Sequence, residues 1–227
     1  MALQLVIGNK NYSSWSMRPW VLMTQLGIPF EELELRFDFA EGSAFRQEVA
    51  RYSPAGKVPV LVDDGFAIWD TLAIAEALHD RFPGAGVWPR GLNERARARS
   101  LCSEMHAGFG ALRSHCPMNI EASLPEIGRQ VWTEHEAVRR DVARIEQMWT
   151  EALLASGGPM LFGAFSAVDA YFAPVVMRLR SYRLPVSAAV QAYGDRLVAV
   201  PGVKRWIDDA LAEQDFLDFE EPYRKSR

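Results

Sequence analysis

The chain has 227 residues, which at ~150 residues per domain allows one large domain or two small ones. Hydrophobic residues make up 49% and charged residues 24%, the balance of a globular protein rather than of a disordered or fibrous one. There are 25 basic and 29 acidic residues and no basic stretch that could follow a phosphate backbone, so we expect no nucleic-acid partner. The two cysteines, Cys102 and Cys116, are too few for a disulfide framework and favour a reducing compartment.

No export or membrane-spanning segment is predicted. The apolar run at 3–7 is short and has no basic leader. The longest uncharged stretch, 152–168, is too short to span a bilayer, and Gly157-Gly158-Pro159 interrupts it. We therefore expect a cytoplasmic protein that does not enter a membrane.

The first third of the chain mixes strand and helix signals. Apolar runs or alternation predict strands at 3–7, 33–37, 58–62 and 66–69. The last two strands form a hairpin, because Asp63-Asp64-Gly65 between them is a turn signal. Helical periodicity predicts helices at about 17–26, about 43–51 and 71–82. The expected order is β-α-β-α-β-β-α.

Everything after Pro83-Gly84 has helical periodicity. Leu101, Met105, Phe109 and Leu112 form one apolar stripe, and a very long amphipathic helix is predicted from Ile127 to Leu153. Ser166 opens another helix, and prolines separate two final helices near 187–199 and 203–212. We predict an α/β domain at 1–82, a linker at 83–93 and an all-helical domain at 94–227.

The first segment that could carry chemistry is the serine-rich stretch 11–19. Proline is tolerated in the first turn of a helix, so Pro19 predicts a helix start near Ser16 or Met17, with Ser16 as the N-cap. Ser13 and Ser14 would then lie in the preceding loop, where a hydroxyl can donate to an anion beside the positive end of the helix dipole. A turn that only caps a helix has the same pattern, so both interpretations stand.

Two further segments could bind an extended, zwitterionic ligand. In Lys57-Val58-Pro59, a cis bond before the proline would turn the Val58 backbone outward to pair with a peptide. The spacing alone favours trans, because cis accounts for only ~5% of X-Pro bonds. At Asp70-Thr71, helix N–H groups and the Thr71 hydroxyl could hold a carboxylate while Asp70 accepts from an ammonium group. Asp70 as a simple N-cap is the alternative.

Other reactive residue types form no motif. The four histidines, at 79, 106, 115 and 135, lack paired-ligand spacing, so no metal site is predicted. No cysteine precedes Cys102, which excludes a CxxC motif for thioredoxin-type exchange in the first third of the chain.

Taken together, these segments resemble a glutathione S-transferase over essentially the whole chain. The resemblance rests on an ordered set: the serine-bearing turn, Val58-Pro59 before a hairpin, Asp70-Thr71 opening a helix, and an all-helical second half. In that half, Phe165-Ser166-Ala167-Val168-Asp169 looks like the family's capping box. Ser13–Trp20 is similar to bacterial serine-type members related to the zeta and tau branches. The resemblance implies an N-terminal thioredoxin-like domain that binds glutathione and a helical domain that supplies the second-substrate pocket.

The resemblance also implies roles for particular residues. Counting back from Gly27, which ends the first helix, the catalytic serine of the family falls on Ser13, with Ser14, Ser16 and Tyr12 as rivals. The glutathione-binding positions fall on Lys57, Val58, Pro59, Asp70 and Thr71. The second-substrate pocket is expected at His106, Phe109, Gly110 and Phe216.

The activity implied is that of a transferase. The serine hydroxyl would stabilise the glutathione thiolate, which would attack a small hydrophobic electrophile. Glutathione would be a co-substrate, no cofactor would be permanently bound, and the protein would be a homodimer with a role in detoxification. A glutathione-dependent isomerase of the maleylacetoacetate type and a non-catalytic glutathione-binding scaffold are the alternatives.

Overall fold

The computed structural model describes residues 3–227 and confirms the predicted order of the first elements. The strands are β1 (Leu3–Gly8), β2 (Phe30–Leu35), β3 (Val60–Asp63) and β4 (Phe66–Ile68). The helices among them are α1 (Ser14–Gln25), α2 (Ala44–Tyr52) and α3 (Thr71–Arg81). The first two residues of the predicted domain 1–82 lie outside the described residues.

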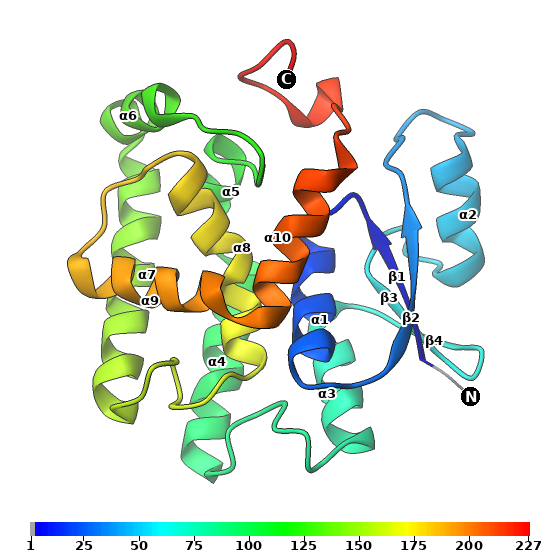
Figure 1. Ribbon diagram of the computed structural model, residues 1–227, viewed down its shortest axis with the longest axis horizontal. Coiled ribbons are helices and arrows are strands. Elements are labelled where there is room, and N and C mark those ends of the chain that lie inside the picture. The colour runs from blue at the N-terminus through cyan, green and yellow to red at the C-terminus, as the bar shows by residue number, and fades with distance from the viewer. Residues whose placement is uncertain (1–2) are drawn as a thin grey trace.

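The four strands form one mixed sheet in the order β2-β1-β3-β4. β1 runs parallel to β2 and antiparallel to β3, and β3 pairs with β4 as the predicted hairpin. β1 is covered on both faces, which is why Leu5, Val6 and Ile7 are an unbroken apolar run. Helix α2 lies on one side of the sheet and α1 and α3 lie on the other (Figure 1).

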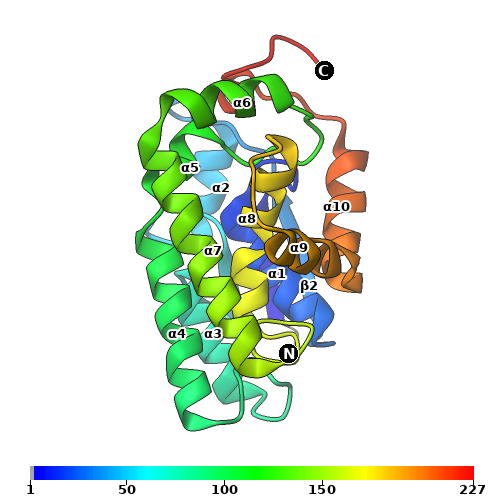
Figure 2. The ribbon, with the colours of Figure 1, turned by 90° about the vertical axis from the view of Figure 1, so that its left-hand side faces the viewer.

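The rest of the chain is helical, as predicted. Its elements are α4 (Leu92–Ala107), α5 (Gly110–His115), α6 (Pro125–Glu134), α7 (Glu136–Ser156), α8 (Ala167–Ser181), α9 (Ala188–Ala199), α10 (Pro201–Glu213) and a 3-10 turn, η1 (Asp218–Glu220). Helix α8 runs through the middle of the molecule, against α1 and α4 (Figure 2). Nearly all of its residues are buried, so it is apolar all round rather than on one face.

The prediction of one long helix from 127 to 153 is wrong, because the helix is interrupted at His135. His135 is extended, with φ −113° and ψ 90°, and separates α6 from α7. The guanidinium of Arg139 donates to the carbonyls of Trp132 and Thr133, which satisfies the end of α6. The His135 ring also stacks on His115 at 3.7 Å between centroids. The apolar period runs on across the break, so periodicity could not show it.

The single stripe predicted from Leu101 to Leu112 is likewise divided. Phe109 has a left-handed backbone, with φ 58°, and separates α4 from α5. Arg113 donates to the carbonyl of His106 at 3.2 Å and so caps the end of α4. All four residues of the stripe are nevertheless buried, so they pack into the core although the helix is interrupted.

The capping box at the start of α8 is confirmed. The Ser166 N–H donates to Asp169 Oδ2 at 3.0 Å, and the Ser166 side chain accepts from the N–H of Asp169 in return. Asp169 also accepts from the Leu161 N–H and from the Tyr193 hydroxyl, so it joins three segments. The limits of the two domains and of the linker stay predictions. Within residues 3–227, no helix is long and apolar enough to cross a membrane.

Candidate functional site

The turn between β1 and α1 carries the serine cluster. Helix α1 begins at Ser14, and Ser13 is its N-cap, which corrects the predicted start near Ser16. The Ser13 Oγ accepts from the Ser16 N–H at 3.4 Å. Pro19 therefore lies beyond the first turn, where it cannot donate to the carbonyl of Trp15. The proline rule placed the start too late because this helix tolerates that lost bond.

Two hydroxyls of the cluster lie against each other. The Ser13 hydroxyl donates to Ser16 Oγ at 2.7 Å, and Ser16 Oγ also accepts from the Gly8 N–H at 3.1 Å. Ser16 is fully buried, whereas Ser13 is at a cavity wall. Ser16 thus ties the end of β1 to the first turn of α1 and holds Ser13 between them.

Two adjoining cavities open beside this turn. The first, here named the serine cavity, has a volume of about 320 Å³. It is lined by Tyr12, Ser13, Ser14, Trp15, Phe37, Phe39, Phe45, Gly56, Lys57, Val58, Arg113, Pro117, Met118, Arg178 and Glu220. The second, the Asp70 cavity, has about 360 Å³ and is lined by Trp15, Ala55, Lys57, Val58, Pro59, Trp69, Asp70 and His106. They share Trp15, Lys57 and Val58, so a ligand can extend from one into the other.

The Val58–Pro59 peptide is cis; Val58 lines both cavities and Pro59 lines the Asp70 cavity. The trans expectation is therefore wrong. The frequency on which it rested averages over all prolines and carries no information about this loop.

Asp70 caps α3 and also faces a cavity. Its side chain accepts from the Thr71 N–H, and Oδ2 lies 3.3 Å from His106 Nε2. The carboxylate is 56% exposed and remains accessible to a ligand. Thr71 is buried and lines neither cavity, and its hydroxyl accepts from Tyr171 at 2.7 Å. That contact leaves the hydrogen of the Thr71 hydroxyl free to donate.

The residues expected at the second-substrate pocket do not line the serine cavity. His106 lies in the Asp70 cavity, against the edge of the Trp15 ring. Phe109 is buried between α4 and α5, Gly110 is exposed at the start of α5, and neither lines a cavity. Phe216 also lines neither, and packs under the guanidinium of Arg224 at 5.6 Å.

Sequence reasoning missed two arginines in the wall of the serine cavity, Arg113 and Arg178. Arg178 donates to Ser14 Oγ at 3.2 Å and to the carbonyl of Cys116. No carboxylate of residues 3–227 pairs with either arginine. Burial, together with repulsion from Arg18, lowers the pKa of Arg178 to about 10. The signal in the sequence was a charged residue inside the apolar stretch of α8.

A third arginine, Arg18, is buried behind the turn. The guanidinium of Arg18 stacks 3.9 Å from the Trp15 ring centroid and 4.8 Å from that of Tyr171. Its Nε and Nη1 atoms have no hydrogen-bond partner among residues 3–227. Burial lowers its pKa to about 10, so it stays charged at neutral pH. Together with the N-terminus of α1, the buried arginines make this wall electropositive and suited to an anion.

Tyr12 is engaged elsewhere. Its hydroxyl donates to Glu221 Oε1 at 2.7 Å and accepts from the Leu217 N–H. Burial and the neighbouring Glu221 carboxylate raise the pKa of Tyr12.

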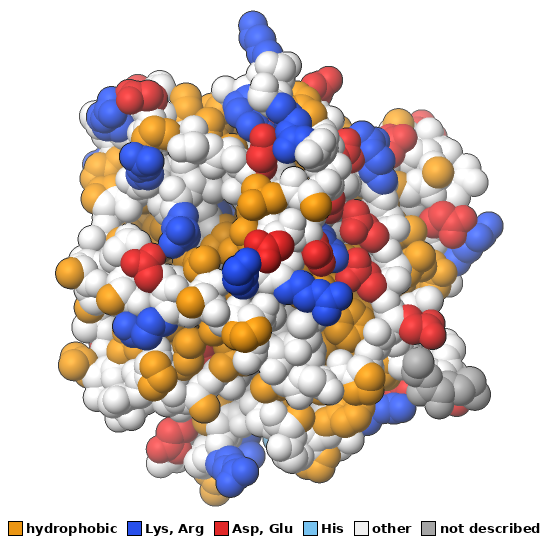
Figure 3. Space-filling model, in the orientation of Figure 1, with side chains coloured by type: hydrophobic (Ala, Val, Ile, Leu, Met, Phe, Trp, Pro, Cys, Tyr) orange, Lys and Arg blue, Asp and Glu red, His pale blue; other side chains and the backbone are white. Residues whose placement is uncertain are grey.

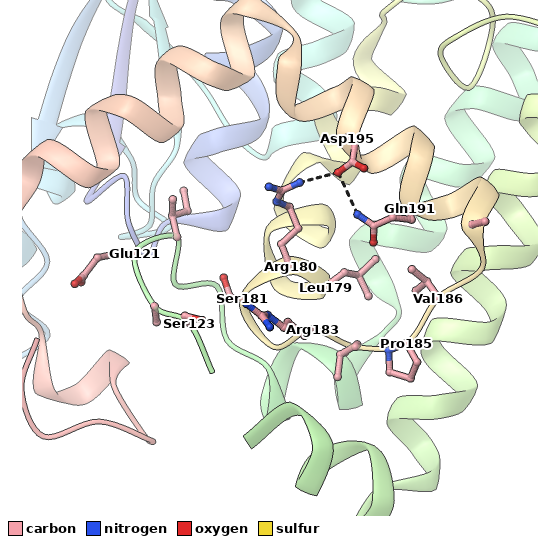
Figure 4. Close-up of a pocket in the computed structure, with 14 residues that line it drawn as sticks. Glu121, Ser123, Leu179, Arg180, Ser181, Arg183, Pro185, Val186, Gln191 and Asp195 are labelled. Atoms are coloured by element: carbon pink, nitrogen blue, oxygen red, sulfur yellow. Dashed lines mark hydrogen bonds and ion pairs between the residues drawn. The ribbon is translucent and has the colours of Figure 1, made fainter. Parts of the chain in front are cut away.

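An open groove of about 920 Å³ lies away from this site, where the end of α8 meets α9 and the loop at 120–123 (Figure 4). Arg180 and Gln191 both bond to Asp195 at its edge. It shares no lining residue with the two cavities. The part of the chain that the structure describes contains no group of three His, Cys, Asp or Glu side chains that could hold a metal ion.

The fold and site define a thioredoxin-like α/β unit joined to a helical unit, with a cavity at the first helix N-terminus. Residues 12–81 match the model of the glutathione S-transferase N-terminal domain, and residues 121–222 match that of the C-terminal domain. The chain belongs to the glutathione S-transferase superfamily.

Individual relatives are distant or match in part. Dichloromethane dehalogenase of Methylorubrum extorquens is 41% identical over 78 residues, which cover 33% of this chain and only 26% of that protein. Maleylacetoacetate isomerase of Rattus norvegicus is 23% identical over 176 residues, 77% of this chain and 78% of that one. A glutathione transferase homolog from Burkholderia with bound glutathione has a similar fold, with a TM-score of 0.71, 24% identity, and coverage of 92% and 98%.

Proposed function

We propose that the protein is a glutathione transferase in which the Ser13 hydroxyl stabilises the glutathione thiolate. The observation that carries the proposal is the position of Ser13, the N-cap of α1 in the wall of a cavity that continues past Val58 to Asp70. Glutathione is an extended peptide with a zwitterionic end. Its ammonium group suits Asp70, its carboxylate suits the N-terminus of α3 rather than the buried Thr71 hydroxyl, and its backbone suits Val58 beside Lys57 and Pro59.

The chemistry needs a thiolate. A free thiol has a pKa near 8.5 and is only a few per cent ionised at pH 7. A hydrogen bond from Ser13, the α1 N-terminus and the charge of Arg18 all favour the ionised sulfur. Lowering the thiol pKa by about two units corresponds to ~2.7 kcal/mol of differential stabilisation. Either hydroxyl of the Ser13–Ser16 pair can donate, so Ser16 can donate to Ser13 while Ser13 turns its hydrogen to the sulfur.

The rival hydroxyls differ in availability. Ser16 is fully buried, and the Tyr12 hydroxyl donates to Glu221. Ser14 lines the serine cavity, and its Oγ accepts from Arg178, which leaves its hydrogen free. Ser14 is therefore the rival that variants have to separate from Ser13.

The serine cavity supports a hydrophobic electrophile as second substrate. Phe37, Phe39 and Met118 provide apolar walls next to Ser13. We also propose a cytoplasmic homodimer: the free thiols of Cys102 and Cys116 suit a reducing compartment, and the dimer follows from the resemblance to the family. A role in detoxification belongs to the same proposal.

A second candidate is a glutathione-dependent isomerase of the maleylacetoacetate type. Arg113 and Arg178 favour it, because maleylacetoacetate carries carboxylates that guanidinium groups bind well. In that reaction the thiol adds and leaves again, so no glutathione is consumed. A transferase consumes one glutathione for each product molecule. A scaffold neither isomerises a substrate nor consumes glutathione.

The testing experiment is a calorimetric titration with glutathione, with the thiol pKa of the bound peptide read from ultraviolet thiolate absorbance. We expect micromolar to millimolar binding and a thiol pKa below that of free glutathione. Binding without a lowered pKa would favour the scaffold, and absence of binding would refute the proposed function.

A further inference from the structure

Side chains on one face of α10 bind the turn that precedes Ser13. Trp206, Asp209 and Glu213 are spaced three and four residues apart and therefore lie on one side of the helix. All three contact Lys10. The Trp206 Nε1–H donates to the Lys10 carbonyl at 3.0 Å, Asp209 Oδ2 lies 2.8 Å from Lys10 Nζ, and Glu213 Oε1 accepts from the Lys10 N–H. None of the three lines either cavity.

Lys10 is only 5% exposed, which is unusual for a lysine. Its ammonium group pairs with Glu32 of β2 at 2.8 Å as well as with Asp209, and lies 4.8 Å from the Trp20 ring centroid. The side chain thus joins the sheet, α1 and α10. In Figure 3, acidic side chains gather between α10 and the neighbouring edge of the sheet.

Glu213 contacts the backbone of the turn most directly. Its second oxygen, Oε2, accepts from the Asn11 N–H at 3.1 Å, so one carboxylate binds two successive amides of the turn. Two residues on, the Ser13 N–H donates to the Asn9 carbonyl at 2.8 Å. The position of residues 9–11 therefore fixes where Ser13 enters the cavity wall.

The chain after Glu213 adds further contacts to the same turn. Gln214 has a left-handed backbone, with φ 52°, and ends the helix. Asp215 Oδ2 then accepts from the Asn9 side chain at 3.2 Å, and the Leu217 N–H donates to the Tyr12 hydroxyl. Both ends of the turn are held by residues about 200 positions later in the sequence.

We propose that Glu213 is a positioning residue for the thiolate reaction: by binding the amides of Lys10 and Asn11, it fixes the Ser13 hydroxyl where the sulfur of glutathione lies. The inference rests on the proposed function. A displacement of about 1 Å of a catalytic group can lower the rate about 100-fold. Loss of the Glu213 carboxylate should therefore slow the thiolate reaction, although Glu213 does not contact the sulfur.

The test uses the full chain and three variants, Glu213→Ala, Glu213→Gln and Asp208→Asn. With glutathione as ligand and 1-chloro-2,4-dinitrobenzene as acceptor, we expect Glu213→Ala to lower kcat at least about tenfold and to change the KM for glutathione by less than about twofold. The thiol pKa of bound glutathione should rise towards that of the free peptide. Glu213→Gln keeps the shape of the side chain and one acceptor oxygen, so it should change kcat and the thiol pKa less than Glu213→Ala does. It also tests the proposal if the alanine variant misfolds.

Asp208→Asn is the matched control, because Asp208 is on the same helix, is 57% exposed and pairs with Lys204. It should leave kcat and the thiol pKa unchanged. If the natural protein lowers the thiol pKa and both Glu213 variants lower it equally, the inference is overturned and the proposed function stands. If the natural protein itself fails to lower the thiol pKa, the proposed function fails and the inference falls with it.

Discussion

Ser13 and Ser14 are adjacent hydroxyls with different partners, and their variants should separate them. Ser13→Ala removes the donor at the N-cap, so we expect kcat to fall by about 100-fold with little change in glutathione affinity. Ser14→Ala leaves that donor in place and should have a much smaller effect on kcat. Steady-state kinetics on both variants check this, and the reverse pattern would assign the thiolate to Ser14.

Asp70 should act on binding rather than on turnover. Asp70→Ala removes an exposed acceptor for the ammonium group of glutathione, so we expect the Kd for glutathione to rise about tenfold, in line with about 1.5 kcal/mol for a charge-assisted hydrogen bond. Calorimetry measures the Kd directly. Asp64→Ala, in the nearby hairpin turn, is the control. An unchanged affinity in Asp70→Ala would contradict the ammonium contact.

The Asp169 carboxylate at the start of α8 makes a prediction about stability. It is fully buried and accepts from Leu161, Ser166 and Tyr193. Burial raises its pKa to about 6, so it is ionised at pH 7. Asp169→Asn points an amide N–H₂ at donors, and we expect the free energy of unfolding to fall by about 3 kcal/mol. Urea unfolding at pH 7 measures this, and a loss below that of the exposed control Asp195→Asn would contradict it.

Glu34 at the sheet edge makes a prediction about pH. Burial and the neighbouring Glu213 carboxylate raise the pKa of Glu34 to about 7. An acid whose pKa is raised on folding stabilises the folded state at low pH and loses that contribution as the pH rises through the raised pKa. Stability should therefore decline between the ordinary pKa of 4.5 and about pH 7 and level off above it, and Glu34→Gln should remove part of that decline. The effect is small, because the side chain is only partly buried and solvent screens its charge.

Urea midpoints measured from pH 4.5 to above pH 7 test this effect, with Glu31→Gln on the same strand as the control. An identical pH dependence in the natural protein and in Glu34→Gln would contradict the prediction.

The elements that sequence reasoning placed well are those whose signals are local. The order of the first seven elements along the chain, the hairpin at Asp63–Gly65 and the capping box at Ser166 follow from alternation, turn residues and cap spacing. The break at His135 could not be predicted, because an arginine from the next helix satisfies the carbonyls that would otherwise favour a continuous helix. The start of α1 was misplaced because proline preference is statistical.

For the site, sequence reasoning identified residues near the cavities but not the wall opposite Ser13. Asp70 and Val58 lie in the predicted segments and face cavities. Arg178 comes from a helix about 160 residues away, and only the packing of α8 against α1 brings it to Ser14. Contacts of this kind depend on tertiary packing, which a motif does not record. The roles of Ser13, Lys57 and Asp70 stay predictions.

At the scale of the whole molecule, the α/β half and the helical half share one core. A single cluster of buried side chains runs from Leu5 in β1 through Trp20 in α1 to Phe172 in α8 and Trp206 in α10. Polar contacts cross the same boundary, from Tyr171 to Thr71 and from Arg178 to Ser14. The two halves therefore have little independent stability.

This shared core predicts one unfolding transition. Tryptophan fluorescence and far-ultraviolet circular dichroism should give the same urea midpoint, because tryptophans lie in both halves of the common core. Two separated midpoints would show that the halves unfold independently.

The shared core also restricts the exchange of halves between this protein and its relatives. A chimera that joined this α/β half to a relative's helical half would replace one side of every contact that α8 and α10 make with α1 and the serine turn. Such a hybrid would have to be repacked before it could fold. Under the proposed function, we therefore expect acceptor choice to be altered more easily by substitutions at Phe39, which lines the serine cavity and meets the ring of Phe219 at 5.0 Å, than by exchange of halves.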